Sequence, residues 1–268
     1  MTALADFGKP PVIEVAIGVQ FEPLKGFSVG HVGLYWATIR EAFGRVEEQV
    51  PITHIVEPPY GPPEVTMGLQ LTEKPEIPRV WFLDDSGCRL IQVQRDRFLH
   101  NWRKMNPSDQ YPRFPSVRDG FFQYWQGFTD FLGENGLKPE PDQCELTYVN
   151  HIKKGEGWDT VGDLDDVFTA FAWRTRAGFL PAPDSARWSL RFLLPENQGR
   201  LYAEVVPVRV PSQKDNVVRF SLTARGRPQG EFSTKGMAEW FAMAREWIVR
   251  GFADLVDEKT DILWEKKV

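Results

Sequence analysis

Hydrophobic and polar residues alternate near the start of the chain and then change to a helical spacing. After Pro10-Pro11, apolar side chains recur mostly at every second position from residue 12 to residue 21, which predicts a strand. From Val29 to Val46 the apolar residues recur at helical steps, and Ser28 is placed to cap a helix. The chain is therefore expected to begin with a strand and an amphipathic helix.

Proline then interrupts the pattern. The stretch from Val50 to Pro78 is rich in proline, which fits neither a helix interior nor a central strand. We expect a long connection there, with at most one edge strand at Glu64 to Leu71. Two apolar runs, Arg79 to Leu83 and Cys88 to Gln94, follow on either side of an Asp-Asp-Ser-Gly turn, and they predict a hairpin.

A second long helix and another strand complete the first half. Apolar residues keep helical spacing from Ser116 until Gly136, and Cys144 to Ile152 predicts a strand. The order strand, helix, hairpin, helix, strand is that of a ferredoxin-like βαββαβ unit. We therefore predict an α+β fold in which antiparallel sheets are covered by long helices, with a ferredoxin-like first half.

The second half has a different pattern. It predicts a short helix from Asp163 to Trp173, three antiparallel strands at residues 188–194, 201–208 and 217–224, and a long helix after Ser233. A boundary fits best between Gly155 and Thr160. It would separate an α+β module of residues 1–154 from a β-meander with C-terminal helices at residues 155–268. One continuous domain is the alternative.

Composition narrows the class of protein. The 268 residues are 42% hydrophobic and 26% charged, and the net charge of −5 gives no overall basic field to attract nucleic acid or an anionic membrane. Cys88 and Cys144 are too few for a disulfide framework, and no zinc, phosphate-loop or dinucleotide motif is present. No signal peptide or membrane span is recognisable. We expect a cytoplasmic protein without a cofactor and without a membrane partner.

The stretch from Leu90 to Lys104 is the most polar of the expected strands. It carries three arginines, namely Arg95, Arg97 and Arg103. In one unbroken strand they would share a face with the apolar residues at positions 91 and 93. Because an unpaired buried charge is very unfavourable, the strand must leave the core near Gln94, contain a bulge, or pair its arginines with carboxylates such as Asp96 and Glu145.

An anion site is the sharper hypothesis for this region. Planar guanidinium groups recognise phosphate or carboxylate through two parallel hydrogen bonds, and Tyr148 and Asn150 would orient the anion. The candidate binding residues are Arg95, Asp96, Arg97, Asn101, Arg103, Tyr111, Arg113, Tyr148, Asn150 and His151. The alternative is a solvated strand end whose arginines lie over Trp102 and Tyr111 in cation–π contacts.

Several segments resemble a known group of proteins. They are an opening PVIEVAIGVQF, followed by QVQRDRF, NWRK, YPR and ELTYVNHI. Together they resemble a sporadically distributed bacterial family of similar length, most specifically in the first half of the chain. That family has no assigned activity, so the resemblance implies no catalytic residues, and its patchy distribution implies an accessory or defence role.

Catalytic patterns are weak. The histidines have no metal-ligand spacing, although His100 and His151 would form an acid/base pair if their strands met. We therefore expect a non-enzymatic binding or interaction protein for an anionic ligand or a protein partner, with oligomerisation left open. One alternative is a nucleic-acid-binding or processing protein, because arginines and aromatics interleave on the later strands, although the acidic total disfavours it. The other is a small-molecule enzyme that uses His100 or His151.

Overall fold

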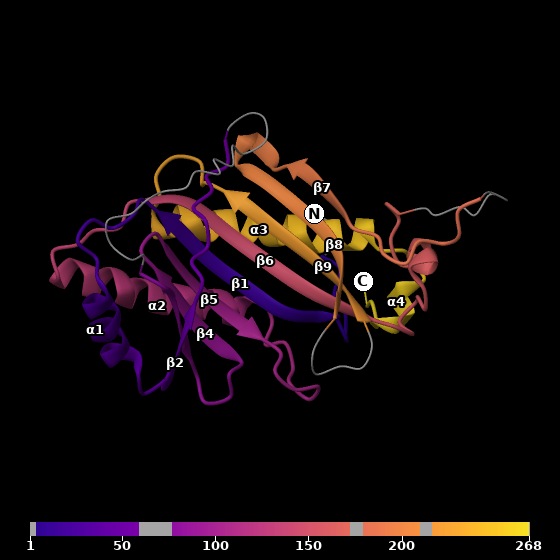
Figure 1. The fold of residues 1–268 in the computed structure, drawn as a ribbon. Helices are drawn as coiled ribbons and strands as arrows, with labels where there is room; N and C mark the ends of the chain where they lie inside the picture. Colours follow the sequence, from indigo (N-terminus) through magenta and orange to yellow (C-terminus); the bar gives the residue numbers. More distant parts are fainter. Residues whose placement is uncertain (1–3, 59–76, 172–178, 210–215, 268) are drawn as a thin grey trace.

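One antiparallel sheet of nine strands runs through the described residues, which are 4–58, 77–171, 179–209 and 216–267 of this computed structural model (Figure 1). The strands follow the spatial order β2-β3-β4-β5-β1-β6-β9-β8-β7. Their bounds are Val12–Phe21 for β1, Arg45–Gln49 for β2, Arg79–Leu83 for β3, Arg89–Gln94 for β4, Arg97–Arg103 for β5, Pro141–Lys153 for β6, Trp188–Leu193 for β7, Gly199–Arg209 for β8 and Asn216–Gly226 for β9.

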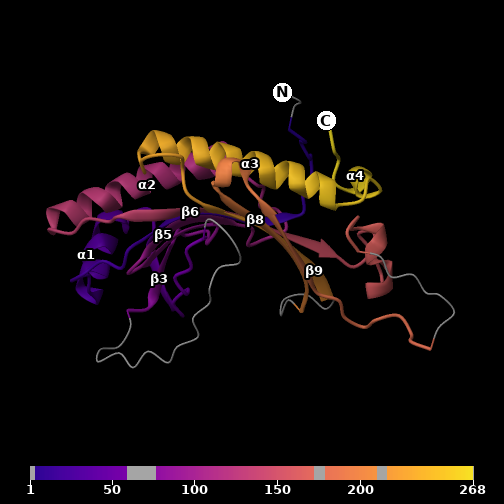
Figure 2. The ribbon, with the colours of Figure 1, turned by 90° about the horizontal axis from the view of Figure 1, so that it is seen from above.

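Helices pack on one face of this sheet, which we call the helix face (Figure 2). The helices are α1 (Val29–Ile39), α2 (Phe114–Glu134), α3 (Thr234–Leu255) and α4 (Thr260–Leu263), with short 3-10 turns η1 (Val161–Asp166) and η2 (Pro195–Asn197). Phe98 of β5 stacks on Phe128 of α2 with ring centroids 5.1 Å apart, and Phe121 of α2 meets Phe241 of α3 at 5.3 Å. The core therefore lies between the two long helices and the helix face.

The expected fold class is wrong. The sequence predicts an α+β protein with several helix-covered sheets and a ferredoxin-like first half, whereas the structure is dominated by one large sheet that extends across both halves. A ferredoxin-like first half would be a separate four-stranded unit, whereas its strands here belong to one continuous antiparallel sheet of nine strands. Strands β2 and β9 extend the sheet beyond such a unit on either side.

Two local errors explain why the first half was mistaken. The helix expected from Val29 to Val46 ends at Ile39, and Arg45–Gln49 forms edge strand β2 instead. The stretch Leu90 to Lys104 is not one strand but the hairpin of β4 and β5, closed by the two residues Arg95 and Asp96. The first half therefore contributes six strands rather than four.

Elements of the second half lie close to their predicted positions. Strands β7, β8 and β9 cover the three expected ranges, and α3 begins after Ser233, whose side chain accepts a hydrogen bond from the Gly236 amide. In the described part of the helix expected from Asp163 to Trp173, only the 3-10 turn η1 is helical, and residues 172 and 173 lie outside the described residues. The edge strand expected at Glu64 to Leu71 lies outside the described residues.

Strand β6 joins the two halves, because it pairs with β1 on one side and with β9 on the other. The division into residues 1–154 and 155–268 stays a prediction. Within the described part of the chain, no helix is long and apolar enough to cross a membrane.

The sheet face opposite the helices carries many buried polar side chains, and we call it the polar face. They are Gln20, Gln92, Gln94, Arg97, Asn101, Gln143 and Arg200, each less than a tenth exposed. The segment 51–58, which we call the strap, forms no strand and is hydrogen-bonded across this face. The strap therefore satisfies part of these buried polar groups, whereas Gln92 and Asn101 bond to each other and to neighbouring strands.

Candidate functional site

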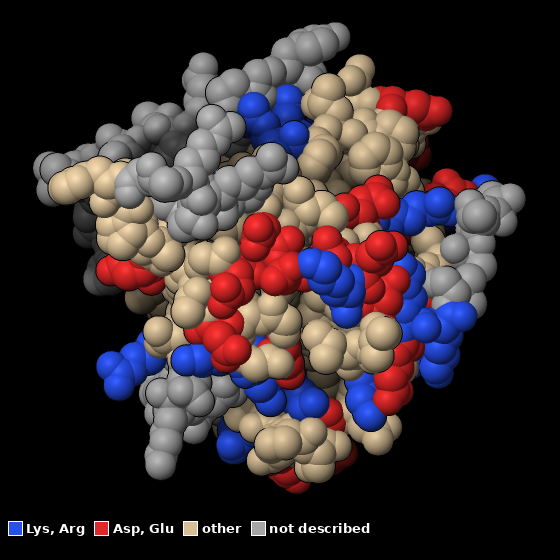
Figure 3. Space-filling model, turned by 90° about the vertical axis from the view of Figure 1, so that its right-hand side faces the viewer, with Lys and Arg blue, Asp and Glu red and all other residues tan. Residues whose placement is uncertain are grey.

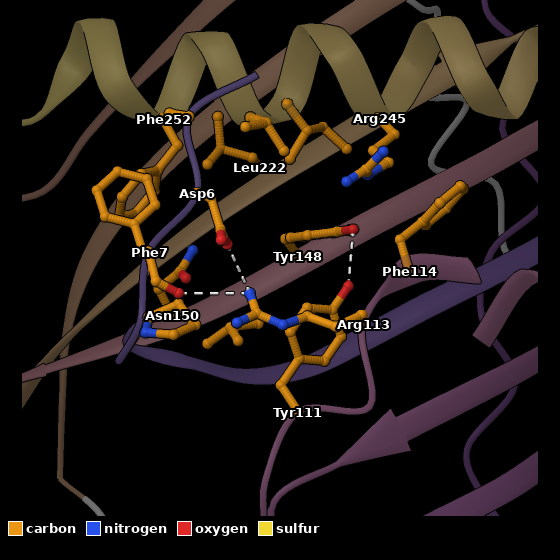
Figure 4. A pocket seen from close by; sticks show the side chains of 15 residues that line it. Asp6, Phe7, Tyr111, Arg113, Phe114, Tyr148, Asn150, Leu222, Arg245 and Phe252 are labelled. Carbon is orange, nitrogen blue, oxygen red and sulfur yellow. Dashed lines mark hydrogen bonds and ion pairs between the residues drawn. The ribbon is translucent and has the colours of Figure 1, made fainter. Parts of the chain in front are cut away.

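A pocket opens on the helix face between the N-terminal segment, β6 and α3 (Figure 4). Its cavity volume is about 90 Å³. Val12, Leu222, Ile248 and Phe252 give it apolar walls. The polar groups that reach it are Asp6, Tyr111, Arg113, Tyr148, Asn150 and Arg245. Four of the ten candidate residues from the sequence, Tyr111, Arg113, Tyr148 and Asn150, therefore meet in one place.

Arg113 has an unusual backbone conformation in this pocket. It precedes α2 with φ 71° and ψ 153°, a region that non-glycine residues rarely occupy. Its guanidinium Nη1 donates to Asp6 Oδ1 at 3.0 Å and to the Phe7 carbonyl at 3.3 Å. Such strain persists only where the surroundings impose it, and it is concentrated at functional sites. The strained backbone therefore keeps Arg113 among the candidate site residues.

Arg245 brings a second guanidinium to the same pocket from α3 (Figure 4). Its charged carbon lies 5.3 Å from the centre of the Phe114 ring. Among the described residues no carboxylate forms an ion pair with Arg245. A half-buried arginine that stacks on a ring and has no acidic partner can still donate hydrogen bonds to an anion.

Two tyrosines form a hydroxyl pair beside these arginines. Tyr111 and Tyr148 are joined by an O–H···O hydrogen bond of 2.9 Å between their hydroxyl groups. Burial raises the pKa of both phenols, so they stay protonated and can donate. Below them Asn150 donates from Nδ2 to the Phe220 carbonyl at 3.1 Å, which fixes the orientation of its amide. The pocket therefore combines positive charge, hydroxyl donors and apolar walls.

The other six candidate residues do not reach this pocket. Arg97 and Asn101 are buried on the polar face, and Asp96 is buried in the β4–β5 turn. Arg95 is exposed in the same turn and donates from Nε to the Leu24 carbonyl. Arg103 donates to the Gly87 carbonyl and lies 5.3 Å from the Trp81 ring. His151 of β6 is on the polar face, opposite Arg219 of β9. The single cluster expected from sequence is thus distributed over two faces of the sheet.

Arg97 is the centre of the polar-face cluster. Its Nη2 donates to Gln20 Oε1 at 2.5 Å and to the Thr53 carbonyl at 3.3 Å, and its Nη1 lies 3.6 Å from Glu145 Oε2. Arg225 also pairs with Glu145, at 2.6 Å from Nε to Oε2, and the two arginines lower the pKa of that buried carboxyl against the opposing effect of burial. Glu145 was one of the partners expected from the sequence.

The acid/base pair expected of His100 and His151 does not form. Strand β1 lies between β5 and β6, and the two imidazoles point to opposite faces. His100 is buried against α2, hydrogen-bonded through Nδ1 to the Val117 carbonyl, and burial lowers its pKa to about 4. Burial also lowers the pKa of His151, assisted by Arg219 and Lys153. His100 therefore has no access to a substrate.

Sequence reasoning missed Arg245, although a signal for it exists. Phe241 and Ile248 belong to the buried stripe of α3, and Arg245 lies four residues after the first and three before the second. A charge within an apolar helical stripe is expected to serve a pocket or a pair. The strap residues and the glutamines that hold them were also missed, because nothing in a single strand shows which loop crosses it.

Known proteins give no information about the family or the function of this chain. No family model matches the chain, and the resemblance to a bacterial family therefore stays a prediction. No curated protein and no solved structure matches the chain either.

Proposed function

We propose that this protein binds a small carboxylate in the pocket on the helix face. The observation that carries the proposal is that Arg113 and Arg245 reach the same apolar-walled pocket, while Arg245 has no acidic partner among the described residues. An anion placed there would gain charge-assisted hydrogen bonds, which are stronger than neutral ones. The function is thus binding, with no catalytic group assigned.

Pocket size and lining narrow the ligand class. Pockets for drug-sized molecules measure roughly 300–1,000 Å³, whereas this cavity is about 90 Å³. It fits a head group with a short apolar part that contacts Leu222, Ile248 and Phe252. One of the two hydroxyl hydrogens of Tyr111 and Tyr148 lies in the bond between them, and the other can be donated to the second carboxylate oxygen. A short-chain carboxylate is the simplest ligand that matches all of these features.

The test is an NMR titration of the full chain with butyrate, using butyramide as the neutral isostere. We expect butyrate to bind and butyramide not to bind. Arg245→Met keeps most of the apolar stem of the side chain and removes its charge, so it should weaken butyrate binding by about tenfold or more, since a hydrogen bond to a charged group contributes about 1.5–3 kcal/mol. Arg118→Met is the control, because Arg118 is on the exposed side of α2 and pairs with Asp119.

Asp6 provides a second arm of the same test. Its carboxylate occupies Arg113 in the free protein, and both side chains of this pair are about half exposed, at 49% each. Asp6→Asn removes a competitor for the guanidinium, so butyrate affinity should rise. Equal affinity for butyrate and butyramide, or unchanged affinity in Arg245→Met, would show that the pocket does not recognise carboxylate.

Nucleic-acid binding has less support. The chain carries a net charge of −5, and on the side shown in Figure 3 acidic and basic side chains are interspersed rather than gathered into a basic patch. Binding to a phosphate backbone depends on a concentrated positive surface. Three arginines of the polar face, Arg97, Arg200 and Arg225, are also engaged with Glu57 and Glu145.

A further inference from the structure

Side-chain amides of three strands hold the main chain of the strap. Gln94 of β4 binds Ile52 in both directions, with N–H and C=O contacts of 2.8 Å each. Gln20 of β1 does the same with Ile55, at 3.3 Å to its amide and 3.1 Å to its carbonyl. Gln143 of β6 donates to the Ile55 carbonyl and accepts from the Glu57 amide, both at 2.8 Å. These contacts are made to main-chain N–H and C=O groups, which peptides have whatever their side chains.

The supporting side chains form a straight row across the sheet. The register places Gln94 opposite Arg97, Arg97 opposite Gln20, and Gln20 opposite Gln143. Neighbouring strands are about 4.8 Å apart and an extended chain advances about 3.3 Å per residue. Three residues of extended chain therefore span two strand spacings, which matches Ile52 on β4 and Ile55 on β1. The spacing of the side chains in this row therefore fits an extended peptide that crosses the strands.

Two side-chain sites of opposite sign lie along this row. His54 of the strap sits between two carboxylates, with Nδ1 2.9 Å from Asp96 Oδ2 and Nε2 3.1 Å from Asp142 Oδ2. Glu57 lies between Arg200 and Tyr202, with contacts of 3.2 Å to Arg200 Nη1 and 2.7 Å to the Tyr202 hydroxyl. The side chains of Glu57 and Arg200 are only 3% and 4% exposed. The face therefore selects a cation and then an anion three residues later.

We propose that the polar face is a peptide-binding groove occupied by the strap, which an extended segment of a partner protein replaces when it carries a basic residue followed three positions later by Asp or Glu. Main-chain contacts provide affinity and the two charged sites provide specificity, as in other modes of extended-peptide recognition. The partner is a protein segment, because the glutamines need alternating N–H and C=O groups.

The manner in which the strap is bound makes it exchangeable. It belongs to no strand, and Val56 within it leaves 46% of its surface exposed. Its hold on the face consists mainly of the six hydrogen bonds with glutamine side chains and the contacts at the two charged sites, each of which a second peptide can reproduce. Because the strap is tethered, it competes at an effective concentration on the millimolar scale. A partner peptide must therefore bind the polar face more tightly than the strap does, or bind when the contacts of the strap are weakened.

The experiment uses a fluorescein-labelled peptide with the sequence of residues 50–58 and fluorescence anisotropy. The full-length double variant His54→Ala/Glu57→Ala weakens the strap and leaves every groove residue in place. We expect it to bind the peptide at least tenfold more tightly than the wild-type chain does. A peptide in which the basic and acidic residues are exchanged should not bind, and adding Gln143→Leu to the double variant should abolish binding.

Circular dichroism establishes that each variant is folded. If the double variant is unfolded, the single variant His54→Ala, which keeps the Glu57–Arg200 pair, takes its place with the same expected result. Failure of a folded strap-weakened variant to bind the peptide would overturn the proposal. Equal binding of the two peptides would also overturn it, because the charged sites would then have no part in recognition.

Discussion

At the scale of single residues, Arg113 has a strained backbone conformation, and its guanidinium lies beside Asp6. Residues in its region of backbone space cost about 1–3 kcal/mol, while its half-exposed ion pair with Asp6 contributes about 0–1 kcal/mol. Arg113→Gly removes both and should leave the free energy of unfolding equal to or above that of the wild type. Arg113→Ala keeps the strain and loses the pair, so it should be about 1 kcal/mol less stable than the glycine variant. Urea denaturation measures the difference.

A substitution to glycine at another position, within α2, supplies the control. Arg118 is within the helix, where glycine is unfavourable by about 1 kcal/mol relative to alanine. Arg118→Gly should therefore be less stable than Arg118→Ala, the reverse of the order expected at Arg113. The same order at both positions would mean that Arg113 is not strained.

His54 gives the strap a pH dependence. Hydrogen bonds to Asp142 and Asp96 raise the pKa of its imidazole to about 9, above the ordinary 6.5. A raised pKa stabilises the folded state fully below pH 6.5, and this contribution is lost as the pH rises through about 9. The stability difference between wild type and His54→Gln should therefore shrink from pH 6 to pH 9.5 in urea denaturation series.

His151 serves as the contrast for His54. Burial and the nearby Arg219 and Lys153 lower the pKa of His151, so its effect on stability appears as the pH falls below 6.5 and is absent above it. His151→Gln should thus differ from wild type in pH dependence only on the acid side. A pH-independent effect of His54→Gln would contradict a charged clamp between Asp96 and Asp142.

At the scale of elements, the close approach of α2 to β5 depends on Gly120. A Cβ at this position would lie 2.6 Å from Cε1 of the buried His100 ring, whereas a Cβ at Gly127 of the same helix would meet nothing within 4 Å. Alanine is favoured over glycine in helices by about 0.8–1 kcal/mol. Gly127→Ala should therefore raise the thermal midpoint and Gly120→Ala should lower it. Similar shifts for both would mean that the helix is not in contact with His100.

The turn between β4 and β5 shows what local sequence can and cannot predict. Two-residue hairpin loops favour glycine-containing pairs such as Asn-Gly, so Arg95-Asp96 gave no turn signal. Tertiary contacts hold this turn instead. The Asp96 carbonyl accepts from the Phe21 amide, the Arg95 carbonyl accepts from the Leu24 amide, and Asp96 Oδ1 accepts from Gln94. The sequence pattern predicted the apolar run that forms β4, but neither the turn at Arg95 and Asp96 nor the separate strand β5.

The strap can be tested at the same scale through Asp96. Asp96 is 6% exposed, and its carboxylate accepts from both Gln94 and His54. Asp96→Ala leaves these donors without their acceptor, which should lower the free energy of unfolding by about 1–3 kcal/mol. Hydrogen exchange of the Ile52 amide, which Gln94 holds, should accelerate more than exchange within β1. Uniform acceleration would indicate global destabilisation rather than release of the strap.

At the scale of the whole molecule, periodicity predicted elements better than it predicted their partners. The apolar stripes of α2 and α3 and the alternation in β7, β8 and β9 are local, and they were readable from the sequence. Which strand neighbours which depends on contacts far apart in the chain, such as the pairing of β6 with β9 and of β1 with β6. For the same reason Tyr111, Arg113, Tyr148 and Asn150 could be proposed as a group, whereas Arg245 arrives from a helix near the other end of the chain.

Continuity of the sheet leads to a prediction about its two halves. A fragment of residues 1–154 would end with β6 as an unpaired edge of 13 residues, and it would expose Tyr148, Asn150 and Ile152, which face β9 and α3 in the whole chain. Long exposed edges pair with other chains. We expect this fragment to aggregate when expressed alone and to co-purify with residues 155–268 when both are expressed together. Backbone contacts from Gly8 and Lys9 to Glu265 and Trp264 add a second seam between the fragments. A soluble 1–154 monomer that unfolds cooperatively in urea would instead establish it as a separate domain.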